Sequence, residues 1–482
     1  MHINIFSTPI TSYVSTPIPS ELLEELSTKL KFRIHGYEYT QLGRSGQWDG
    51  YKRLFKRRDR SFPTGCIRRV LNIFKGAGHT FDVEYSVNDL PVGELKVADI
   101  KPFPFQFECA QKAIDGRYGI IHAPVRAGKT AIIGLMLSRI SQHPTWIITY
   151  GKDLVVQTQR EMERFLQKKV GLFSESVFED GDVIVSSYQA LSRLYDSVSK
   201  SSVIKHRNVE IKASIENAKV LILDECQYAL APKTSVLLSK FDKVSFRIGL
   251  SGTPKPTNKS RLEVEAVIGP ILVKIPIKQL IELKRIAKPV ALIYDLPATW
   301  FTYHLDEFAE WYEANIVRNV CRNKLISKLV DKLNAQNKTC FVMVRKRYHG
   351  ELLQELIPRS VYVHGDIASN IRKELYSRLH KKEISCIIST VGKVGLDIPN
   401  LNAVINAEGL AAETITLQKM RSLTASSDKD YGIIIDFMDH GVYLRDHSEL
   451  RLAMYKKIDG FIIKEFKVPP TLFGETDGQD GQ

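Results

Sequence analysis

Short apolar runs rich in β-branched residues alternate with helical patterns from residue 118 onward. The runs are too continuous for strands with one face in water, so they indicate strands buried on both faces of a parallel sheet. In chain order they read GIIHAP, TWIITY, VIVSSY, VLILDE and FRIGLSG. A second series begins near Thr339 and reads TCFVMV, VYVHG, SCIIST, NAVINAE and YGIIIDF. The pattern predicts two α/β units in tandem.

The first hundred residues lack this alternation. They combine short mixed elements with turn signals at Gly43, Gly46 and Gly50, which predicts a separate small α+β domain. We place the domains at 1–100 for this N-terminal domain, 101–289 for the first α/β unit, 290–460 for the second and 461–482 for a C-terminal tail.

Charge changes the picture because it is concentrated. The 482 residues are 44% hydrophobic and 25% charged, which excludes a mainly disordered chain. Lys and Arg total 68 against 54 Asp and Glu, giving a net charge of +14 that favours a polyanionic partner. Residues 51–75 and 315–349 each hold nine basic residues and one acid, so the rest of the chain carries −2. Each basic window is either a solvated surface or an anion-binding face.

Cysteine spacing and apolar runs exclude several other classes. The six cysteines lie at least 19 positions apart, so they form no CxxC pair and no zinc pattern, and we expect reduced thiols. The first twenty residues hold no Lys or Arg, unlike a signal peptide. No apolar run approaches the roughly 18 residues of a membrane helix. We therefore expect a cytoplasmic protein with no membrane partner.

A phosphate-binding loop is predicted after the first apolar run. Ala123-Pro-Val-Arg-Ala-Gly128-Lys129-Thr130 fits A/G-x4-G-K-[ST], directly after a strand and before a helix. Small residues let consecutive backbone N–H groups face one concavity, where they and the helix N-terminus hold phosphate oxygens. Lys129 is expected to reach the β- and γ-phosphates, and the Thr130 hydroxyl to bind Mg²⁺. The alternative is a chance match on a strand-loop-helix.

Two adjacent acids end the fourth apolar run. Asp224 is expected to hold Mg²⁺ through water, and Glu225 to orient and deprotonate the attacking water. The alternative is an N-cap for the next helix. Together with the loop at Lys129, the pair predicts a hydrolase whose cofactors are ATP and Mg²⁺.

These residues resemble a known family. Asp224-Glu225-Cys226-Gln227 is similar to the DEAD/DEAH/DECH signature of superfamily 2 helicases, and Ser251-Gly252-Thr253 to the motif that follows it. The resemblance implies two RecA-like domains that close on ATP and reopen after hydrolysis, with Gln227 relaying a hydrogen bond between nucleotide and the third motif. Pro104-Phe105-Gln106 resembles the adenine motif, in which Phe105 stacks on the base and Gln106 bonds its edge.

Further motifs imply contacts to nucleic acid and ribose. Residues 151–157 and 185–189 resemble strand-gripping motifs, and 363–365 and 390–399 resemble their counterparts in the second unit. The residues implied in nucleic-acid contact are Ser187, Tyr188, Gln189, His364, Gly365 and Thr390, joined by Arg345, which follows the strand TCFVMV. Gly395, Asp397 and Gln418 are implied on the nucleotide side. In 418–421 the family pattern QRxGRxxR is altered, so Arg421 is the one matching candidate for the arginine that completes the ATP site.

The N-terminal segment narrows the resemblance. Residues 45–54 and 62–65 are similar to the front domain of phage UvsW-type helicases, which are related to XPB and RecG-like remodellers. This implies ATP-driven fork regression, Holliday junction branch migration and R-loop unwinding in phage recombination, repair and replication, in the cytoplasm of a host bacterium. The implied partner is branched or forked DNA, with an RNA–DNA hybrid also allowed, and the implied state is a monomer.

The basic stretch after this motif is the expected DNA contact. The residues are Trp48, Lys52, Arg53, Lys56, Arg57 and Arg58, in which cations neutralise phosphates and aromatic rings, including Phe55 and Phe62, stack on unpaired bases. The alternative is that the aromatic residues form the core of a small domain. Two other functions stay open: an RNA helicase, because no residue visibly reads a 2′-hydroxyl, and an ATP-gated DNA-binding motor subunit without strand separation.

Overall fold

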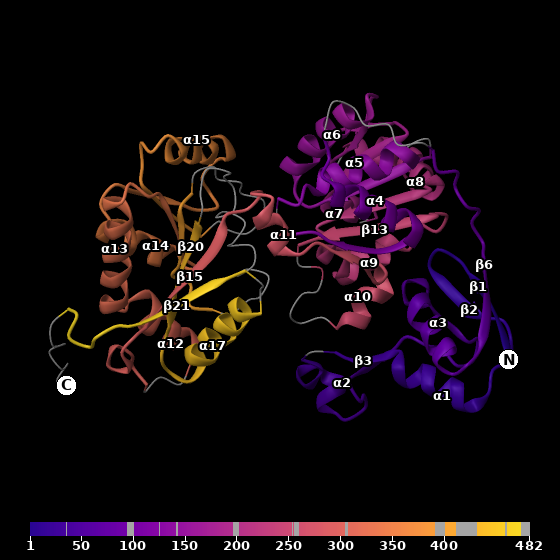
Figure 1. Ribbon diagram of the computed structural model, residues 1–482, viewed down its shortest axis with the longest axis horizontal. Coiled ribbons are helices and arrows are strands. Elements are labelled where there is room, and N and C mark those ends of the chain that lie inside the picture. Colours follow the sequence, from indigo (N-terminus) through magenta and orange to yellow (C-terminus); the bar gives the residue numbers. More distant parts are fainter. Residues whose placement is uncertain are drawn as a thin grey trace. The chain divides into compact units, whose positions relative to one another are not determined.

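The computed structural model describes residues 1–34, 36–93, 101–124, 126–140, 143–195, 202–252, 254, 260–303, 307–390, 401–410, 431–457 and 460–473. Contacts divide the chain into two compact units, Met1–Ile275 and Pro276–Gln482 (Figure 1). The predictions for Gly395, Asp397, Gln418 and Arg421 lie outside the described residues.

The first unit contains the first predicted α/β sheet. Among its described residues eight strands pair in the order β10-β9-β11-β8-β12-β13-β7-β14, parallel except at β10. The five apolar runs are all strands with almost every residue buried, so the expectation of a sheet covered on both faces is confirmed. The strands are β7 (Tyr118–His122), β8 (Thr145–Thr149), β9 (Gly171–Phe173), β10 (Phe178–Glu179), β11 (Val183–Ser187), β12 (Val220–Asp224), β13 (Phe246–Ser251) and β14 (Ile271–Lys274). The helices are α4 (Pro104–Gly116), α5 (Lys129–Ile140), α6 (Lys152–Leu166), α7 (Tyr188–Leu194), α8 (Ser202–Asn217), α9 (Pro232–Leu238) and α10 (Arg261–Val267).

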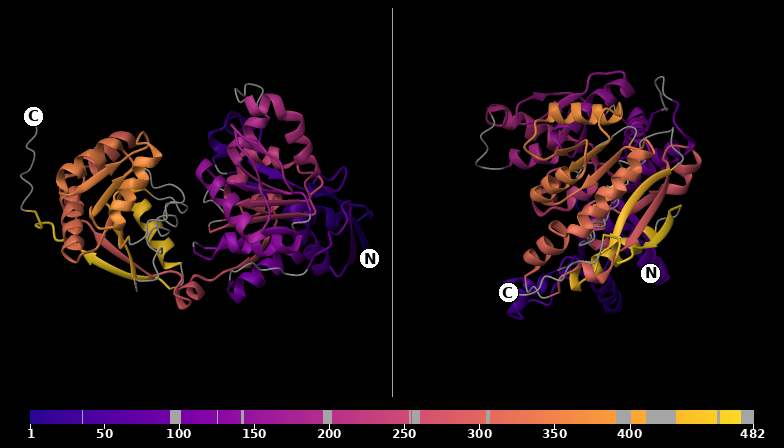
Figure 2. Two further views of the ribbon diagram at one scale, coloured as in Figure 1. Left: turned by 90° about the horizontal axis from the view of Figure 1, so that it is seen from above. Right: turned by 90° about the vertical axis from the view of Figure 1, so that its left-hand side faces the viewer.

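The second unit repeats this architecture with seven strands among its described residues, all parallel, in the order β17-β18-β16-β19-β20-β15-β21. Alternate residues of β16 enter two different apolar cores, as expected of a sheet with helices on both faces (Figure 2). The strands are β15 (Lys288–Asp295), β16 (Cys340–Met343), β17 (Ser360–Val363), β18 (Cys386–Ser389), β19 (Ala403–Asn406), β20 (Tyr431–Met438) and β21 (Ile462–Lys467). The helices are α11 (Ile277–Glu282), α12 (Phe308–Tyr312), α13 (Val320–Ala335), α14 (Arg347–Leu356), α15 (Ser369–His380) and α17 (Val442–Lys456).

Two predicted boundaries are wrong. The second unit begins at Pro276, and a boundary at 290 would cut β15, which starts at Lys288. The predicted tail at 461–482 contains β21, which pairs with Val290–Asp295 and lies beside β15 in Figure 1. The polar sequence IIKEFK concealed this strand, because an edge strand in water carries charged residues that protect it from pairing with other chains.

The front segment, residues 1–93, folds around a core of its own. Its sheet has the order β5-β2-β1-β6 and is covered by α1 (Ser20–Lys29) and α3 (Ile67–Gly76), while β3 (Lys31–Arg33) and β4 (Tyr51–Arg53) form a ribbon. The remaining strands are β1 (His2–Ser7), β2 (Thr11–Val14), β5 (Ser61–Pro63) and β6 (Thr80–Tyr85), and a short helix α2 spans Gln41–Arg44. Phe55 and Phe62 are buried in this core, so the alternative reading of these two aromatics is the correct one.

The front segment is not a separate compact body, contrary to the predicted domain at 1–100. Its apolar core includes Leu262 of α10, and Arg69 pairs with Glu265 of the same helix at 2.7 Å. A Cβ on Gly65 would lie 1.9 Å from the Glu265 carbonyl oxygen, so only glycine allows this approach. Helix α10 therefore contributes to two cores, that of the front segment through Leu262 and that of the first sheet through Val264 and Ile268.

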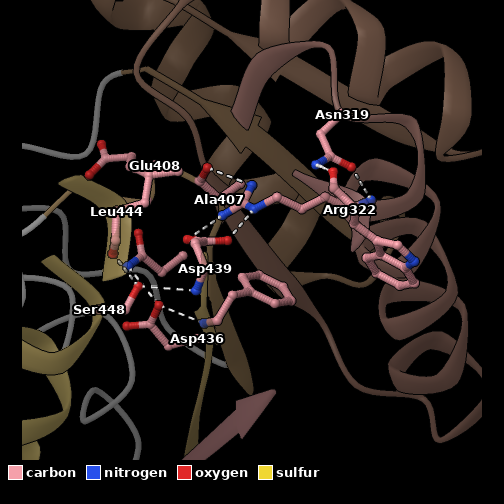
Figure 3. A network of polar contacts seen from close by, with 12 residues as sticks. Asn319, Arg322, Ala407, Glu408, Asp436, Asp439, Leu444 and Ser448 are labelled. Carbon is pink, nitrogen blue, oxygen red and sulfur yellow. Dashed lines mark hydrogen bonds and ion pairs between the residues drawn. The ribbon is translucent and has the colours of Figure 1, made fainter. Parts of the chain in front are cut away.

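Buried arginines hold the second unit together (Figure 3). Arg322 of α13 pairs with Asp439 at 2.8 Å and donates to the Ala407 carbonyl at 3.0 Å. Arg451 of α17 pairs with Asp436 of β20 at 3.0 Å and lies 3.7 Å from Asp439. These contacts join α13, β20, α17 and the segment after β19 around one set of charges.

Asp439→Asn is expected to lower the free energy of unfolding by about 3–5 kcal/mol, because it leaves Arg322 buried without its carboxylate. Urea unfolding of the full chain measures this change. The control Arg318→Met removes an exposed pair with Glu313 and should cost less than about 1 kcal/mol. An equal loss in both variants would show that the buried network is no more important than a surface pair.

Acidification is expected to destabilise the second unit through His349 of α14. Its ring is buried with Nε2 3.0 Å from Asn323 Oδ1, and burial lowers the pKa of His349 to about 3. The unfolded chain, with a histidine pKa of about 6.5, then binds more protons, so stability falls by about 1.4 kcal/mol per pH unit below that value. His349→Gln should lack this contribution in urea titrations between about pH 7 and pH 5. An unchanged slope would mean that other groups control the acid response.

Candidate ATP-binding site and nucleic-acid surface

The strand order of the first sheet brings the predicted motifs together at the carboxyl ends of neighbouring strands. β13 lies between β12 and β7, and all three run in the same direction. The carboxyl end of β7 leads into the phosphate loop, that of β12 carries Asp224, and that of β13 carries Ser251. Ligands of α/β folds bind at the carboxyl ends of the strands.

Gln106 is hydrogen-bonded to the backbone of the phosphate loop. Its Nε2 donates to the Ala127 carbonyl at 2.8 Å, and its Oε1 accepts the Phe103 N–H at 2.9 Å. Gly128 has φ +76, and a Cβ there would lie 2.3 Å from the Gln106 amide nitrogen. Glycine is therefore required at this position both for the left-handed backbone and for the approach of Gln106.

The adenine prediction changes at Phe105. This ring is buried and stacks on Phe103 with centroids 5.8 Å apart, so it has no open face for a base. Phe103, which directly precedes Pro104, is partly exposed. The Gln106 amide is hydrogen-bonded to Phe103 and Ala127. Its contact with adenine stays a prediction.

Lys129 lies between the two acids. Its Nζ donates to Glu225 Oε1 at 2.5 Å and is 3.4 Å from Asp224 Oδ1. Glu225 is buried and has φ 48, a left-handed conformation that costs free energy for a residue with a side chain. Strained residues of this kind are concentrated at functional sites, and the strain here turns the carboxylate toward the phosphate loop.

Gln227 connects the acids to β13. Its Nε2 donates to Glu225 Oε2 at 3.0 Å, and its Oε1 accepts the Ser251 hydroxyl at 2.6 Å. A chain of buried hydrogen bonds thus runs from Lys129 through Glu225 and Gln227 to Ser251. The structure brings these residues together as the sequence predicts.

The residues present fit a magnesium nucleotide. Thr130 lies in the first turn of α5 and is partly exposed, as is Asp224 at the end of β12. Burial raises the pKa of Asp224 while the Lys129 ammonium opposes the rise, so the ionised carboxylate is favoured by a cation beside it. No cluster of three or more His, Cys, Asp or Glu occurs among the described residues. Mg²⁺ is usually bound by one or two carboxylates together with phosphates and water, and Asp224 offers one such carboxylate.

Two nucleic-acid predictions in the first unit are wrong. Ser187 is buried and its hydroxyl oxygen accepts the Ala190 N–H at 3.1 Å, which caps α7. Tyr188 is buried and its hydroxyl donates to the Asp224 carbonyl at 3.3 Å. Both side chains therefore make contacts within the protein: Ser187 caps α7, and Tyr188 holds the backbone at Asp224. Gln189 is partly exposed, and its Oε1 has no hydrogen-bond partner in the described part of the chain.

The second unit gathers its predicted residues at one edge. β17, β18 and β16 are neighbours and parallel, so their carboxyl ends lie side by side. His364 and Gly365 follow β17, Thr390 follows β18, and Arg345 follows β16 and is exposed. These four residues share one edge of the sheet, although they are up to 45 positions apart in the sequence.

The basic windows are only partly available to a ligand. In the front segment Lys52, Lys56 and Arg58 are exposed, whereas Arg53 pairs with Asp49 and Arg57 with Glu24. Trp48 is half-buried, with its indole N–H donating to the Tyr51 carbonyl at 3.1 Å. In the window 315–349, the buried Arg322 belongs to the network of the second unit, while Lys324, Lys328 and Lys332 are exposed on α13.

Comparison with known proteins agrees with this site. Residues 99–256 match the family described as type III restriction enzyme, res subunit, and residues 321–420 match the helicase conserved C-terminal domain. The chain is 22% identical over 463 residues to the ATP-dependent DNA helicase uvsW of Enterobacteria phage T4, covering 89% of each chain. The chain belongs to the superfamily 2 helicases.

Two solved structures share the fold of this helicase. DUF1998 helicase MrfA, bound to DNA and AMPPNP, matches with a TM-score of 0.54 at 13% identity, covering 78% of this chain and 57% of that one. Dbp5 of S. cerevisiae, bound to RNA and ADP BeF3, matches with a TM-score of 0.51 at 14% identity, covering 75% and 90%. The two tandem RecA-like domains are thereby confirmed. Within the described part of the helicase, no helix is long and apolar enough to cross a membrane.

Glu225→Gln is expected to reduce ATP turnover by about 100-fold or more while ATP binding persists, because the amide cannot accept a proton from water. Steady-state hydrolysis and retention of labelled ATP measure the two effects. Glu179→Gln, an exposed change on β10 of the same unit, is the matched control. Turnover at the wild-type rate in Glu225→Gln would remove Glu225 from the role of base.

Proposed function

We propose that this helicase uses ATP hydrolysis to remodel branched DNA by fork regression, Holliday junction branch migration and R-loop unwinding. The observation that carries the proposal is the packing of the front segment on α10 of the ATP-binding unit, through Leu262, Glu265 and Gly65. DNA held by the front segment would be carried by the same body that binds ATP. The 22% identity to a phage protein named as an ATP-dependent DNA helicase supports the choice of DNA.

The chemistry follows from the residues at the edge of the first sheet. Lys129 and the backbone at the start of α5 would hold the phosphates, and Thr130 and Asp224 would hold Mg²⁺. The metal would neutralise charge that develops on the phosphates. Glu225 would orient water and take its proton, and the hydrogen bonds from Glu225 through Gln227 to Ser251 would link that proton transfer to β13.

The front segment would contact DNA mainly through backbone phosphates. Lys52, Lys56 and Arg58 are exposed and form no ion pair among the described residues. Trp48 keeps a partly exposed ring on which an unpaired base could stack. Cations specify no sequence, so this surface suits a ligand that is recognised by shape.

The test is ATP hydrolysis by the full chain in the presence of fork, four-way junction, duplex, single-stranded DNA or RNA. We expect fork and junction to stimulate most. Replacing Lys52, Lys56 and Arg58 together by Ala should weaken fork binding and reduce the salt dependence by about 3 in the slope of log K against log salt, since about one counterion is released per phosphate contact. The control replaces the exposed Lys457, Lys464 and Lys467 and should leave the slope unchanged.

Three outcomes would contradict the proposal. Absence of stimulation by every DNA would exclude a DNA-driven motor. Equal or stronger stimulation by RNA would favour an RNA helicase. Stimulation without strand separation or branch migration would favour an ATP-gated DNA-binding subunit.

A further inference from the structure

A pocket of about 320 Å³ lies inside the first unit, where the front segment meets the sheet. Lys52, Arg53 and Lys56 line it from the front segment, and Arg247 lines it from β13. Ser239, which directly follows α9, contributes a further polar residue, and no acidic residue is among the lining. The pocket is therefore basic and is built from both parts of the unit.

Arg247 is a buried charge with little compensation. The residue is 4% exposed, its Nη2 donates to the Pro9 carbonyl at 3.0 Å, and its guanidinium lies 5.3 Å from the centre of the Tyr118 ring. Its Nε has no hydrogen-bond partner among the residues that the structure describes. Within the part of the chain that the structure describes, Arg247 forms no ion pair with a carboxylate.

The other buried arginines show what this one lacks. Arg322 and Arg451 are 0% and 1% exposed, and each forms ion pairs with aspartates that are also buried. Desolvating a cation is costly unless an opposite charge accompanies it. Arg247 has a carbonyl oxygen and an aromatic face instead, which satisfy part of the guanidinium but leave its charge unbalanced. An anion in the pocket would supply the missing charge.

Two lysines add positive charge to the pocket lining. Lys52 and Lys56 are exposed and have no ion pair among the described residues, whereas Arg53 is paired with Asp49. Glu265, which precedes the lining residue Ala266, is already bound by Arg69 and Arg261. Two ammonium groups and one guanidinium therefore face a space without a carboxylate of its own.

The pocket is separate from the ATP site. Arg247 lies near the amino end of β13, and Ser251 lies at the carboxyl end beside Gln227. Four residues of a strand separate the two by about 13 Å. A ligand bound at Arg247 would thus lie near the amino ends of the strands, whereas the phosphate loop lies at their carboxyl ends.

We propose that this pocket is a second phosphate-binding site, in which Lys52, Lys56 and Arg247 bind a phosphate group at the junction of the front segment and the sheet. A volume of about 320 Å³ accommodates a phosphate together with an attached sugar. The phosphate belongs either to the backbone of a strand on the front segment or to a free mononucleotide. Binding of a strand's backbone phosphate rests on the proposed function, whereas binding of a free mononucleotide does not.

The test is protection of lysines from acylation, read by mass spectrometry on the full chain without ATP. Inorganic phosphate at about ten times its Kd is expected to slow labelling of Lys52 and Lys56 about tenfold, because about one pocket in eleven then remains free. Lys75, exposed at the end of α3 and outside the pocket, is the internal control. A single-stranded oligonucleotide and deoxyadenosine monophosphate, each competed with phosphate, distinguish the two sources. Equal slowing at Lys75, or none at Lys52 and Lys56, would overturn the proposal.

Arg247→Met tests the buried charge itself. The variant should bind phosphate at least about tenfold more weakly, since a charge-assisted hydrogen bond is lost. Phosphate should raise the unfolding temperature of the wild type more than that of the variant. Phosphate bound at Lys129 would stabilise both proteins equally, so it does not contribute to this difference. Protection that persists in Arg247→Met would overturn the assignment of this residue.

A second pair of changes keeps the test open if Arg247→Met does not fold. Lys52→Ala combined with Lys56→Ala alters only exposed side chains and should remove the same phosphate-dependent part of the rise in unfolding temperature. An undiminished rise would overturn the site. Neither experiment measures ATP hydrolysis or unwinding, so failure of the branched-DNA proposal and failure of the phosphate pocket give different results.

Discussion

The ion pair between Lys129 and Glu225 is the contact on which the ATP site depends. The two residues are 96 positions apart, and their side chains meet at 2.5 Å because β7, β13 and β12 are parallel neighbours. Were any of these strands reversed, its loop would emerge at the opposite edge of the sheet. The direction of the strands, set by the crossover helices between them, is therefore the constraint that makes the chemistry possible.

Much of this site follows from the sequence, since its signals are local. Continuous apolar runs predict strands buried on both faces, and the spacing of Gly128, Lys129 and Thr130 predicts a phosphate loop. Parallel strands then place Asp224 and Glu225 beside that loop without any knowledge of distances. The link through Gln227 to Ser251 was also predictable, because it follows from the family resemblance.

The errors arise where burial depends on distant partners. A Ser-Tyr pair after a strand can face a ligand or cap the next helix, and Ser187 and Tyr188 do the latter because α7 packs beneath Asp224. Arg322 reads as one of several cations on a helix, yet its carboxylate comes from Asp439, 117 positions later. Phe55 and Phe62 lie in a basic run, but a small segment needs its few large apolar residues inside. Counting charge along the chain thus overstates the charge available at the surface.

The packing of the front segment on α10 also determines where the polypeptide can be divided. Leu262 belongs to the core of the front segment although it lies some 170 positions beyond residue 93, and Glu265 receives arginines from both sides of that junction. A fragment that begins at the first sheet would expose apolar surface on α10 and leave a buried carboxylate with half of its partners. As a module for recombination between related proteins, the front segment is inseparable from α10, so the natural unit of exchange is residues 1–275 rather than the first hundred.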